Sequence, residues 1–219
     1  MQRTLNEFDS MAELDRAGLP TVPRALVDSA DAAAAFGERT GWPIVLKGVV
    51  DGVAHKSDVG LVHLDLANAD AARHAWTRLA ADMASLEAAG GARIVAQAMV
   101  RDGLELIVGV TNEPGLGRFL LVGQGGRLAE AIADVHLWAL PVSRGRLRAT
   151  LAGTTAGRML LSPRWRNPAS IDTLADVLMR LQDHVMGADG ASLLAVEINP
   201  LSISPTRSLA LDALVIRAD

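Results

Sequence analysis

Short apolar runs that suit strands are interspersed along this chain with longer, alanine-rich patterns that suit helices. The runs predict strands at residues 24–27, 43–50, 61–66, 93–100, 105–111, 119–122, 134–140, 193–198 and 209–212. Helical spacing and capping residues predict helices at residues 11–17, 29–40, 68–89, 144–161 and 171–186. Because strands and helices follow one another in a mixed order, the pattern predicts an α+β fold rather than a regular doubly wound sheet.

The composition is that of an ordinary globular protein, with 50% hydrophobic and 21% charged residues. The length of 219 residues suits one domain or two small lobes. A net charge of −4 argues against nucleic acid as a partner, and the absence of cysteine excludes disulfides and thiolate chemistry. No apolar run approaches the roughly 20 residues that span a bilayer, and the polar N-terminus lacks a signal-peptide core. We therefore expect a cytoplasmic protein without a membrane partner.

Lysine is scarce, since only Lys47 and Lys56 occur among 21 basic residues. Lys47 lies inside a strand predicted to be buried, where a lysine needs an anionic partner or an opening to a cleft. Lys56 lies in the loop His55–Gly60, whose glycine, hydroxyl and lysine suit the wrapping of phosphates by backbone N–H groups. The spacing is not that of a Walker A loop, and a solvated surface loop is the alternative. A neutral His55 in this loop is a candidate phosphoryl acceptor.

Glu197 and Asn199 are two residues apart in a predicted strand that Pro200 is expected to end, so their side chains share one face. With Asp212 on the next strand they form a candidate Mg²⁺ site, because this ion takes a few protein oxygens together with water and phosphate oxygens. The alternative is the exposed face of a half-buried strand.

Two further segments are compatible with nucleotide binding. The strand end Gln97–Val100 would present backbone groups to an adenine edge, with Met99 as an apolar contact and Glu105 near a ribose or a metal-bound phosphate. The glycine-rich run 123–126, followed by Glu130 and Asp134, allows close backbone approach to a phosphate. A structural strand end and a simple turn are the respective alternatives.

Together these segments resemble the ATP-grasp domain of ADP-forming acyl-CoA synthetases, over nearly the whole chain. The matching segments, in the family's order, are Gly41–Lys47, Ala54–Gly60, Gln97–Val100, Gly103–Gly109, Gly125–Gly126, Glu197–Pro200 and Asp212–Ala213. The Asn-Pro and Asp elements near the C-terminus are also similar to those of the succinyl-CoA synthetase β subunit.

The resemblance implies a single ATP-grasp domain over residues 1–219, with lobes at 22–98 and 99–219 that clasp ATP or ADP and a helical extension at 1–21. It implies that Lys47 contacts phosphates, while Asn199 and Asp212 bind Mg²⁺. The other residues that it implies for nucleotide binding are His55, Lys56, Ser57, Gly60, Gln97, Met99, Val100 and Glu105. It implies catalytic roles for Lys47, His55 and Glu197, with His55 matching a histidine of the phosphoryl relay.

The resemblance also implies a partner, because the chain lacks the CoA-binding part of the family, which carries the phosphohistidine loop. We expect a CoA-binding α subunit supplied in trans. The chain departs from the family pattern at Leu61, at Trp138 and at residues 164–167. These departures slightly favour one alternative, a non-catalytic nucleotide-sensing module, and a stand-alone ATP-grasp carboxylate ligase is another.

Overall fold

The computed structural model describes residues 2–49, 61–84, 93–126, 134–162 and 171–218. They form two compact units, a larger unit of residues 1–21 and 102–219 and a smaller unit of residues 22–101. The expected boundary between lobes, after residue 98, lies three residues before the end of the smaller unit. Residues 1–21 belong to the larger unit. Within the described residues, no helix is long and apolar enough to cross a membrane.

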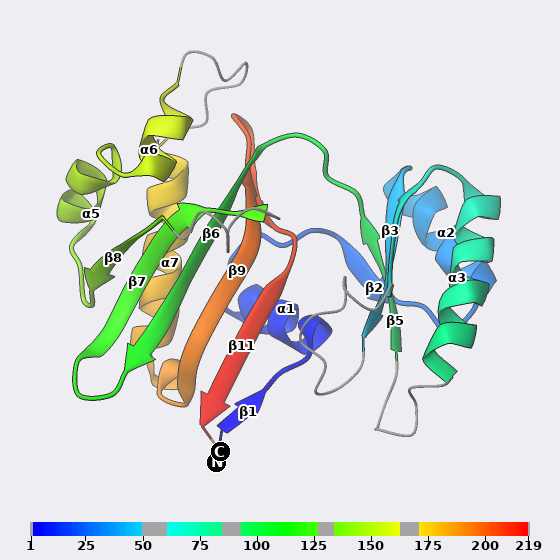
Figure 1. The fold of residues 1–219 in the computed structure, drawn as a ribbon, viewed down its shortest axis with the longest axis horizontal. Coiled ribbons are helices and arrows are strands. Elements are labelled where there is room, and N and C mark those ends of the chain that lie inside the picture. The colour runs from blue at the N-terminus through cyan, green and yellow to red at the C-terminus, as the bar shows by residue number, and fades with distance from the viewer. Residues whose placement is uncertain (1, 50–60, 85–92, 127–133, 163–170, 219) are drawn as a thin grey trace. The chain divides into compact units, whose positions relative to one another are not determined.

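The larger unit is built on an antiparallel sheet (Figure 1). Its strands, in spatial order, are β1 (Gln2–Thr4), β11 (Ala213–Ala218), β9 (Leu193–Ile203), β6 (Leu104–Glu113), β7 (Gly117–Gln124) and β8 (Val135–Ala139). The short strand β10 (Ser208–Ala210) also pairs with β9. Buried side chains alternate along the long strands, as they do for Leu106, Val108 and Val110, so one face of this sheet forms the core.

Helices cover that face of the larger sheet (Figure 1). They are α1 (Glu7–Arg16), α5 (Arg144–Leu151), α6 (Thr155–Leu160) and α7 (Ile171–Met186), with a 3-10 turn at Ala188–Gly190 after α7. The long helix α7 buries an apolar stripe that includes Leu174, Leu178 and Leu181, with spacings of four and three residues. We call the side of the sheet turned away from this stripe the face opposite α7.

The smaller unit has its own antiparallel sheet, in the order β2 (Arg24–Leu26), β5 (Arg93–Ala98), β3 (Ile44–Val49) and β4 (Val62–Leu66). Helices α2 (Ala30–Thr40) and α3 (Ala69–Ala84) cover one face, and Ser29 caps α2 by accepting the N–H of Ala32. Ile44 and Leu46 point into this core together with Leu79. Strand alternation therefore turns Lys47 toward the opposite face.

Most predicted elements are confirmed, and the exceptions have local causes. The helix predicted at 144–161 is two helices, because the Thr154 side chain accepts the N–H of Gly157 and starts a new helix. Pro200 does not end its strand. Its carbonyl accepts the N–H of Leu211, and β9 continues to Ile203. The strand predicted at 209–212 is interrupted before Ala213, so Asp212 lies between β10 and β11.

A buried carboxylate joins three elements of the larger unit. Glu13 of α1 is 1% exposed, and its carboxylate lies 2.7 Å from Arg217 of β11 and 2.8 Å from His184 of α7. Arg16 also pairs with it. Burial alone would raise the pKa of Glu13, but the hydrogen bond from His184 and the charge of Arg217 outweigh burial and lower it. The ionised carboxylate therefore holds α1 against α7 and the sheet.

We predict that Glu13→Ala lowers the free energy of unfolding by about 3 kcal/mol at neutral pH, because it leaves the partly buried Arg217 and the hydrogen-bonding nitrogen of His184 without their partner. Since the pKa of Glu13 is lowered on folding, its contribution is complete above the ordinary carboxyl pKa and is lost as the pH falls through the lowered value. Urea unfolding at several pH values should therefore show the two proteins converging in acid. A difference that stays constant down to the acid limit would contradict this assignment.

Candidate functional site

The larger unit brings Asn199 and Asp212 together on the face opposite α7. Ile198 is fully buried and pairs with Ala213 across β9 and β11. Just beyond this pair, the N–H of Asn199 donates to the carbonyl of Asp212 at 3.2 Å, and Asp212 lies in the short segment between β10 and β11. The two predicted metal ligands are therefore neighbours.

The glycine turn after β7 joins these residues to Glu105 of β6. The N–H of Gly126 donates to Oδ1 of Asn199 at 3.0 Å, and the N–H of Gly125 donates to the carbonyl of Glu105 at 3.0 Å. A Cβ on Gly126 would lie 2.2 Å from Oε2 of Glu105, so this carboxylate lies directly against the glycine. The turn thus contacts Asn199 and Glu105, and Asn199 bonds to the backbone of Asp212; we call Glu105, Asn199 and Asp212 the oxygen cluster.

The oxygen cluster fits a small hard cation such as Mg²⁺ in the chemistry of its donors. It offers the carboxylates of Glu105 and Asp212 and the amide oxygen of Asn199, which keeps a lone pair beside the one that Gly126 uses. Within the described ranges, no three His, Cys, Asp or Glu side chains form a metal-binding group. A cation here would therefore complete its coordination with water or substrate oxygens, as Mg²⁺ usually does.

Glu197 lies two residues before Asn199 in β9, so its side chain shares the same face. It is half-buried and pairs with Gly109 on one side and Leu214 on the other. A Cβ on Gly109 would lie 2.5 Å from the carbonyl oxygen of Val196, so β6 and β9 approach closely beside the Glu197 backbone. The predicted strand spacing of Glu197 and Asn199 is confirmed as a shared face, although Pro200 does not end the strand.

The smaller unit carries a second group of predicted residues. Lys47 is 8% exposed and Gln97 is 5% exposed, on the neighbouring strands β3 and β5. Gln97 pairs with Val45, two residues before Lys47, so Lys47 and Gln97 lie diagonally on the face turned away from α2 and α3. Met99 and Val100 follow β5 and are half-buried, and the N–H of Met99 donates to the carbonyl of Pro43 at 3.2 Å.

Several predicted residues lie outside the described part of the chain. They are His55, Lys56, Ser57 and Gly60 of the proposed phosphate loop, and Glu130 of the glycine-rich segment. Their roles remain predictions from the sequence.

Two of the residues predicted to depart from the family pattern lie in packed cores. Leu61 is 1% exposed and packs in the core of the smaller unit, under α3. Trp138 is 5% exposed on the α7 side of β8, and its indole N–H donates to Oγ1 of Thr150 at 2.8 Å. Trp138 therefore does not lie on the face that carries the oxygen cluster, and Leu61 belongs to the other unit.

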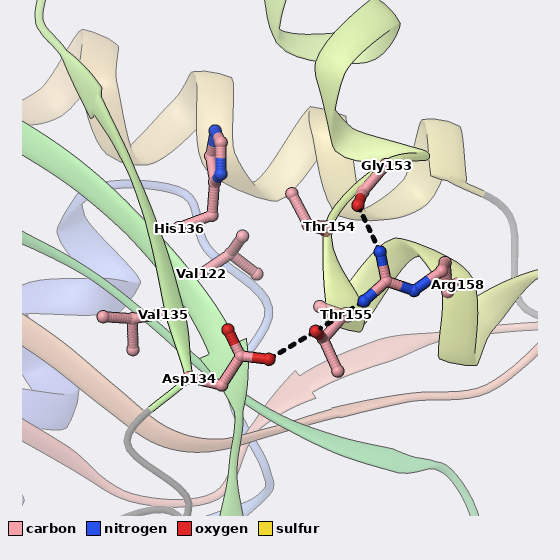
Figure 2. A pocket seen from close by; sticks show the side chains of 9 residues that line it. Val122, Asp134, Val135, His136, Gly153, Thr154, Thr155 and Arg158 are labelled. Carbon is pink, nitrogen blue, oxygen red and sulfur yellow. Dashed lines mark hydrogen bonds between the residues drawn. The ribbon is translucent and has the colours of Figure 1, made fainter.

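Asp134 belongs to a different cavity, on the helix-covered face of the larger sheet. This cavity of about 220 Å³ lies between β8 and the start of α6, with Asp134 and His136 on one side and Thr155 and Arg158 on the other (Figure 2). Arg158 donates to Oγ1 of Thr155, and Thr155 donates to Asp134. Arg158, Thr155 and Asp134 thus bond to one another in this cavity, apart from the oxygen cluster.

The contact that sequence reasoning missed is the one between Gly126 and Asn199, 73 residues apart. The glycine pair itself was the available signal, because only glycine tolerates such close approach. A Cβ on Gly125 would lie 2.3 Å from the carbonyl carbon of Leu106.

Comparison with known proteins agrees with this architecture. The ATP-grasp domain family matches residues 1–216, and the chain belongs to this family. An ADP-forming acetate–CoA ligase I of Archaeoglobus fulgidus is 30% identical over 89% of this chain and 28% of its own length. The β subunit of the ADP-forming acetate–CoA ligase I of Pyrococcus furiosus is 25% identical over 98% of this chain and 92% of its own length. The chain thus spans under a third of the first relative and nearly all of the second.

Solved structures show the same fold. An acetyl-coenzyme A synthetase 1 of Ca. Korarchaeum cryptofilum, in complex with coenzyme A and Ca-AMPCP, superposes with a TM-score of 0.88 and 27% identity, over 99% of this chain and 94% of that chain. The same enzyme with coenzyme A and Mg-AMPPCP, its phosphohistidine segment pointing towards the nucleotide-binding site, gives a TM-score of 0.82 and 25% identity, over 99% and 93% of the two chains. The expected α+β ATP-grasp fold is confirmed.

We predict that Gly125→Ala lowers the free energy of unfolding by about 1–3 kcal/mol, because the new methyl group meets the backbone of β6 and that strand must move. Gly145→Ala is the matched control, since a Cβ there meets nothing within 4 Å. Gly145 lies in α5, where alanine favours the helix by up to about 1 kcal/mol. Urea unfolding measures the free energy of unfolding of both variants. Equal values for the two would contradict the role of Gly125.

Proposed function

We propose that this chain is the nucleotide-binding β component of an ADP-forming acid–CoA ligase. It binds ADP or ATP with Mg²⁺ and exchanges a phosphoryl group with a phosphohistidine of a CoA-binding partner. The observation that carries the proposal is the oxygen cluster, in which Asn199 and Glu105 contact the Gly125–Gly126 turn and the backbone of Asn199 bonds to that of Asp212. Relatives named as acid–CoA ligases, and a nucleotide-bound structure of the same fold, support it.

In this proposal Asn199 and Asp212 hold the magnesium ion, with Glu105 beside them. When bound, the ion neutralises phosphate charge during phosphoryl transfer. Glu197, on the same face, is proposed to keep the reacting groups oriented through its carboxylate.

Residues of the smaller unit are proposed to hold the nucleotide. Lys47 is proposed to supply a positive charge to the phosphates from the face of β3 turned away from α2 and α3. Gln97, Met99 and Val100 are proposed to contact the base, and Lys56, Ser57 and Gly60 to contact phosphates.

His55 is proposed to relay the phosphoryl group. Its imidazole nitrogen forms a bond to the γ-phosphorus of ATP as the bond to the bridging oxygen breaks and ADP leaves, and the reverse step regenerates ATP. The chain would then need a partner that carries CoA and the acyl group. One relative is named as a β subunit, and this supports the proposal that the partner is a separate α subunit.

We predict that ADP with Mg²⁺ stabilises the protein, by about 2.7 kcal/mol at 100 times the dissociation constant. Lys47→Met keeps the aliphatic stem and loses the charge, and Asp212→Asn keeps the shape and loses the charge. Each should weaken ADP binding by about tenfold or more, since each removes a hydrogen-bonding charged group. Isothermal titration with and without Mg²⁺ measures the affinity, and thermal unfolding measures the stabilisation.

The matched controls for these two variants are Arg144→Met and Asp176→Asn, which remove the two charges of a surface ion pair between α5 and α7. Their ADP affinity should equal that of the wild type. If millimolar ADP with Mg²⁺ neither binds nor stabilises the wild-type chain, the proposed function is wrong.

The relay gives a separate prediction. Incubation with Mg²⁺ and ATP labelled in the γ-phosphate should leave acid-labile, base-stable label on the wild-type chain and none on His55→Asn, because a phosphorus–nitrogen bond hydrolyses in acid. His74→Asn, an exposed histidine of α3, is the control and should label normally. Equal labelling of His55→Asn and the wild type would exclude His55 as the acceptor.

A further inference from the structure

Both chain connections between the two units are held by one hairpin of the larger unit, formed by the end of β9 and by β10. The first connection is Pro20–Thr21. The carbonyl of Pro20 accepts the N–H of Ala210 at 2.9 Å, and Thr21 forms a parallel bridge with Ala210. The hydroxyl of Thr21 also donates to Asp15 of the preceding segment at 2.5 Å.

The second connection, at Asp102, is fixed by the other strand of the hairpin and by its loop. Oγ of Ser202 donates to the carbonyl of Asp102 at 2.8 Å, and Nη2 of Arg207 lies 2.5 Å from the Asp102 carboxylate. Gly103 follows with a φ of +115°, and a Cβ there would lie 2.1 Å from Oγ of Ser202. The chain therefore passes very close to β9 as it returns to the larger unit.

The same ladder carries the metal-binding candidates. Leu201 pairs with Ala210, the N–H of Leu211 donates to the carbonyl of Pro200 at 3.0 Å, and Asn199 then bonds to Asp212. The anchors of both connections and the two ligands thus follow one another within residues 199–212. Two single backbone hydrogen bonds, at Pro200–Leu211 and at Asn199–Asp212, thus bridge the gap between the β9–β10 and β9–β11 ladders, and they connect the ligands to the anchors.

We propose that this hairpin couples metal–nucleotide binding to the direction in which both connections leave the larger unit. Binding at Asn199 and Asp212 fixes the hairpin, and the hairpin fixes Thr21 and Asp102. Ser202 and Arg207 are positioning residues, since they hold Asp102 and neither belongs to the oxygen cluster. The proposal rests on the proposed function, which supplies the nucleotide.

The absence of cysteine allows a direct test on the full chain. Ala81→Cys on α3 and Ala149→Cys on α5 replace exposed alanines, one in each unit, and accept a donor and an acceptor dye. We expect energy transfer between the dyes to change when ADP and Mg²⁺ are added to the otherwise wild-type chain. With Arg207→Ala and Ser202→Ala together, the change should shrink by half or more, and ADP binding should weaken about fivefold, the equivalent of one hydrogen bond.

Two further variants separate coupling from loss of stability. The first variant exchanges the two charges, with Asp102→Arg and Arg207→Asp together, so that an ion pair of reversed polarity forms. Its change in energy transfer and its affinity for ADP should both match those of the wild type. Arg148→Ala breaks an ion pair of the same 2.5 Å length and similar exposure between α5 and α7, and should alter neither. Both ion pairs are at the surface and contribute little to folding.

The proposal is overturned if the paired Ser202 and Arg207 variant binds ADP and changes energy transfer as the wild type does. It is also overturned if Arg148→Ala has the same effect as that variant, because the effect would then be general. If the wild-type chain itself does not bind ADP with Mg²⁺, the proposed function fails first and the coupling fails with it.

Discussion

The pairing of β9 with β10 and β11 is the interaction on which the candidate site depends. Ile198 and Ala213 must face α7, because their side chains belong to the core of the larger unit. Asn199 follows Ile198 in β9, so its side chain faces the other way, and its N–H donates to the carbonyl of Asp212. The apolar core thus places the polar ligands without any direct contact with them. A one-residue slip of this pairing would bury both oxygen-bearing side chains and expose the apolar ones.

The geometry of the oxygen cluster also depends on the close approach of the Gly125 backbone to β6. The oxygen cluster needs β6, β9 and the turn after β7 to meet at one place, and a side chain at Gly125 would separate them. The donated hydrogen bond from Gly126 then sets the orientation of the Asn199 amide. In the smaller unit the corresponding constraint is again a covered face, because Ile44 and Leu46 pack under the helices and turn Lys47 to the other side. In both units the helices bury one face of the sheet, so the residues that can meet a ligand are those on the other face.

Features set by local spacing could be predicted from the sequence. The shared face of Glu197 and Asn199 follows from their separation by two residues, and the cap at Ser29 follows from its residue type. Features set by distant contacts could not. The bond from Gly126 to Asn199 spans 73 residues, and the buried pair of Glu13 and His184 spans 171. Pro200 looked like a strand end because proline lacks an N–H, but its carbonyl still pairs with Leu211 and the strand continues.

The alternation of faces along a strand also bears on the positions where this chain is predicted to differ from its family. Leu61 and Trp138 are positions where the sequence predicts a departure from the family pattern, and both side chains are buried on helix-covered faces. A substitution on such a face changes packing, whereas one on the other face changes the groups that meet a ligand. Leu61 belongs to the smaller unit and Trp138 to the α7 side of β8, so neither contacts the turn at Gly125 and Gly126 that orients Asn199 and lies against Glu105. The face on which a residue lies, rather than its distance along the chain from a motif, decides whether its replacement bears on function.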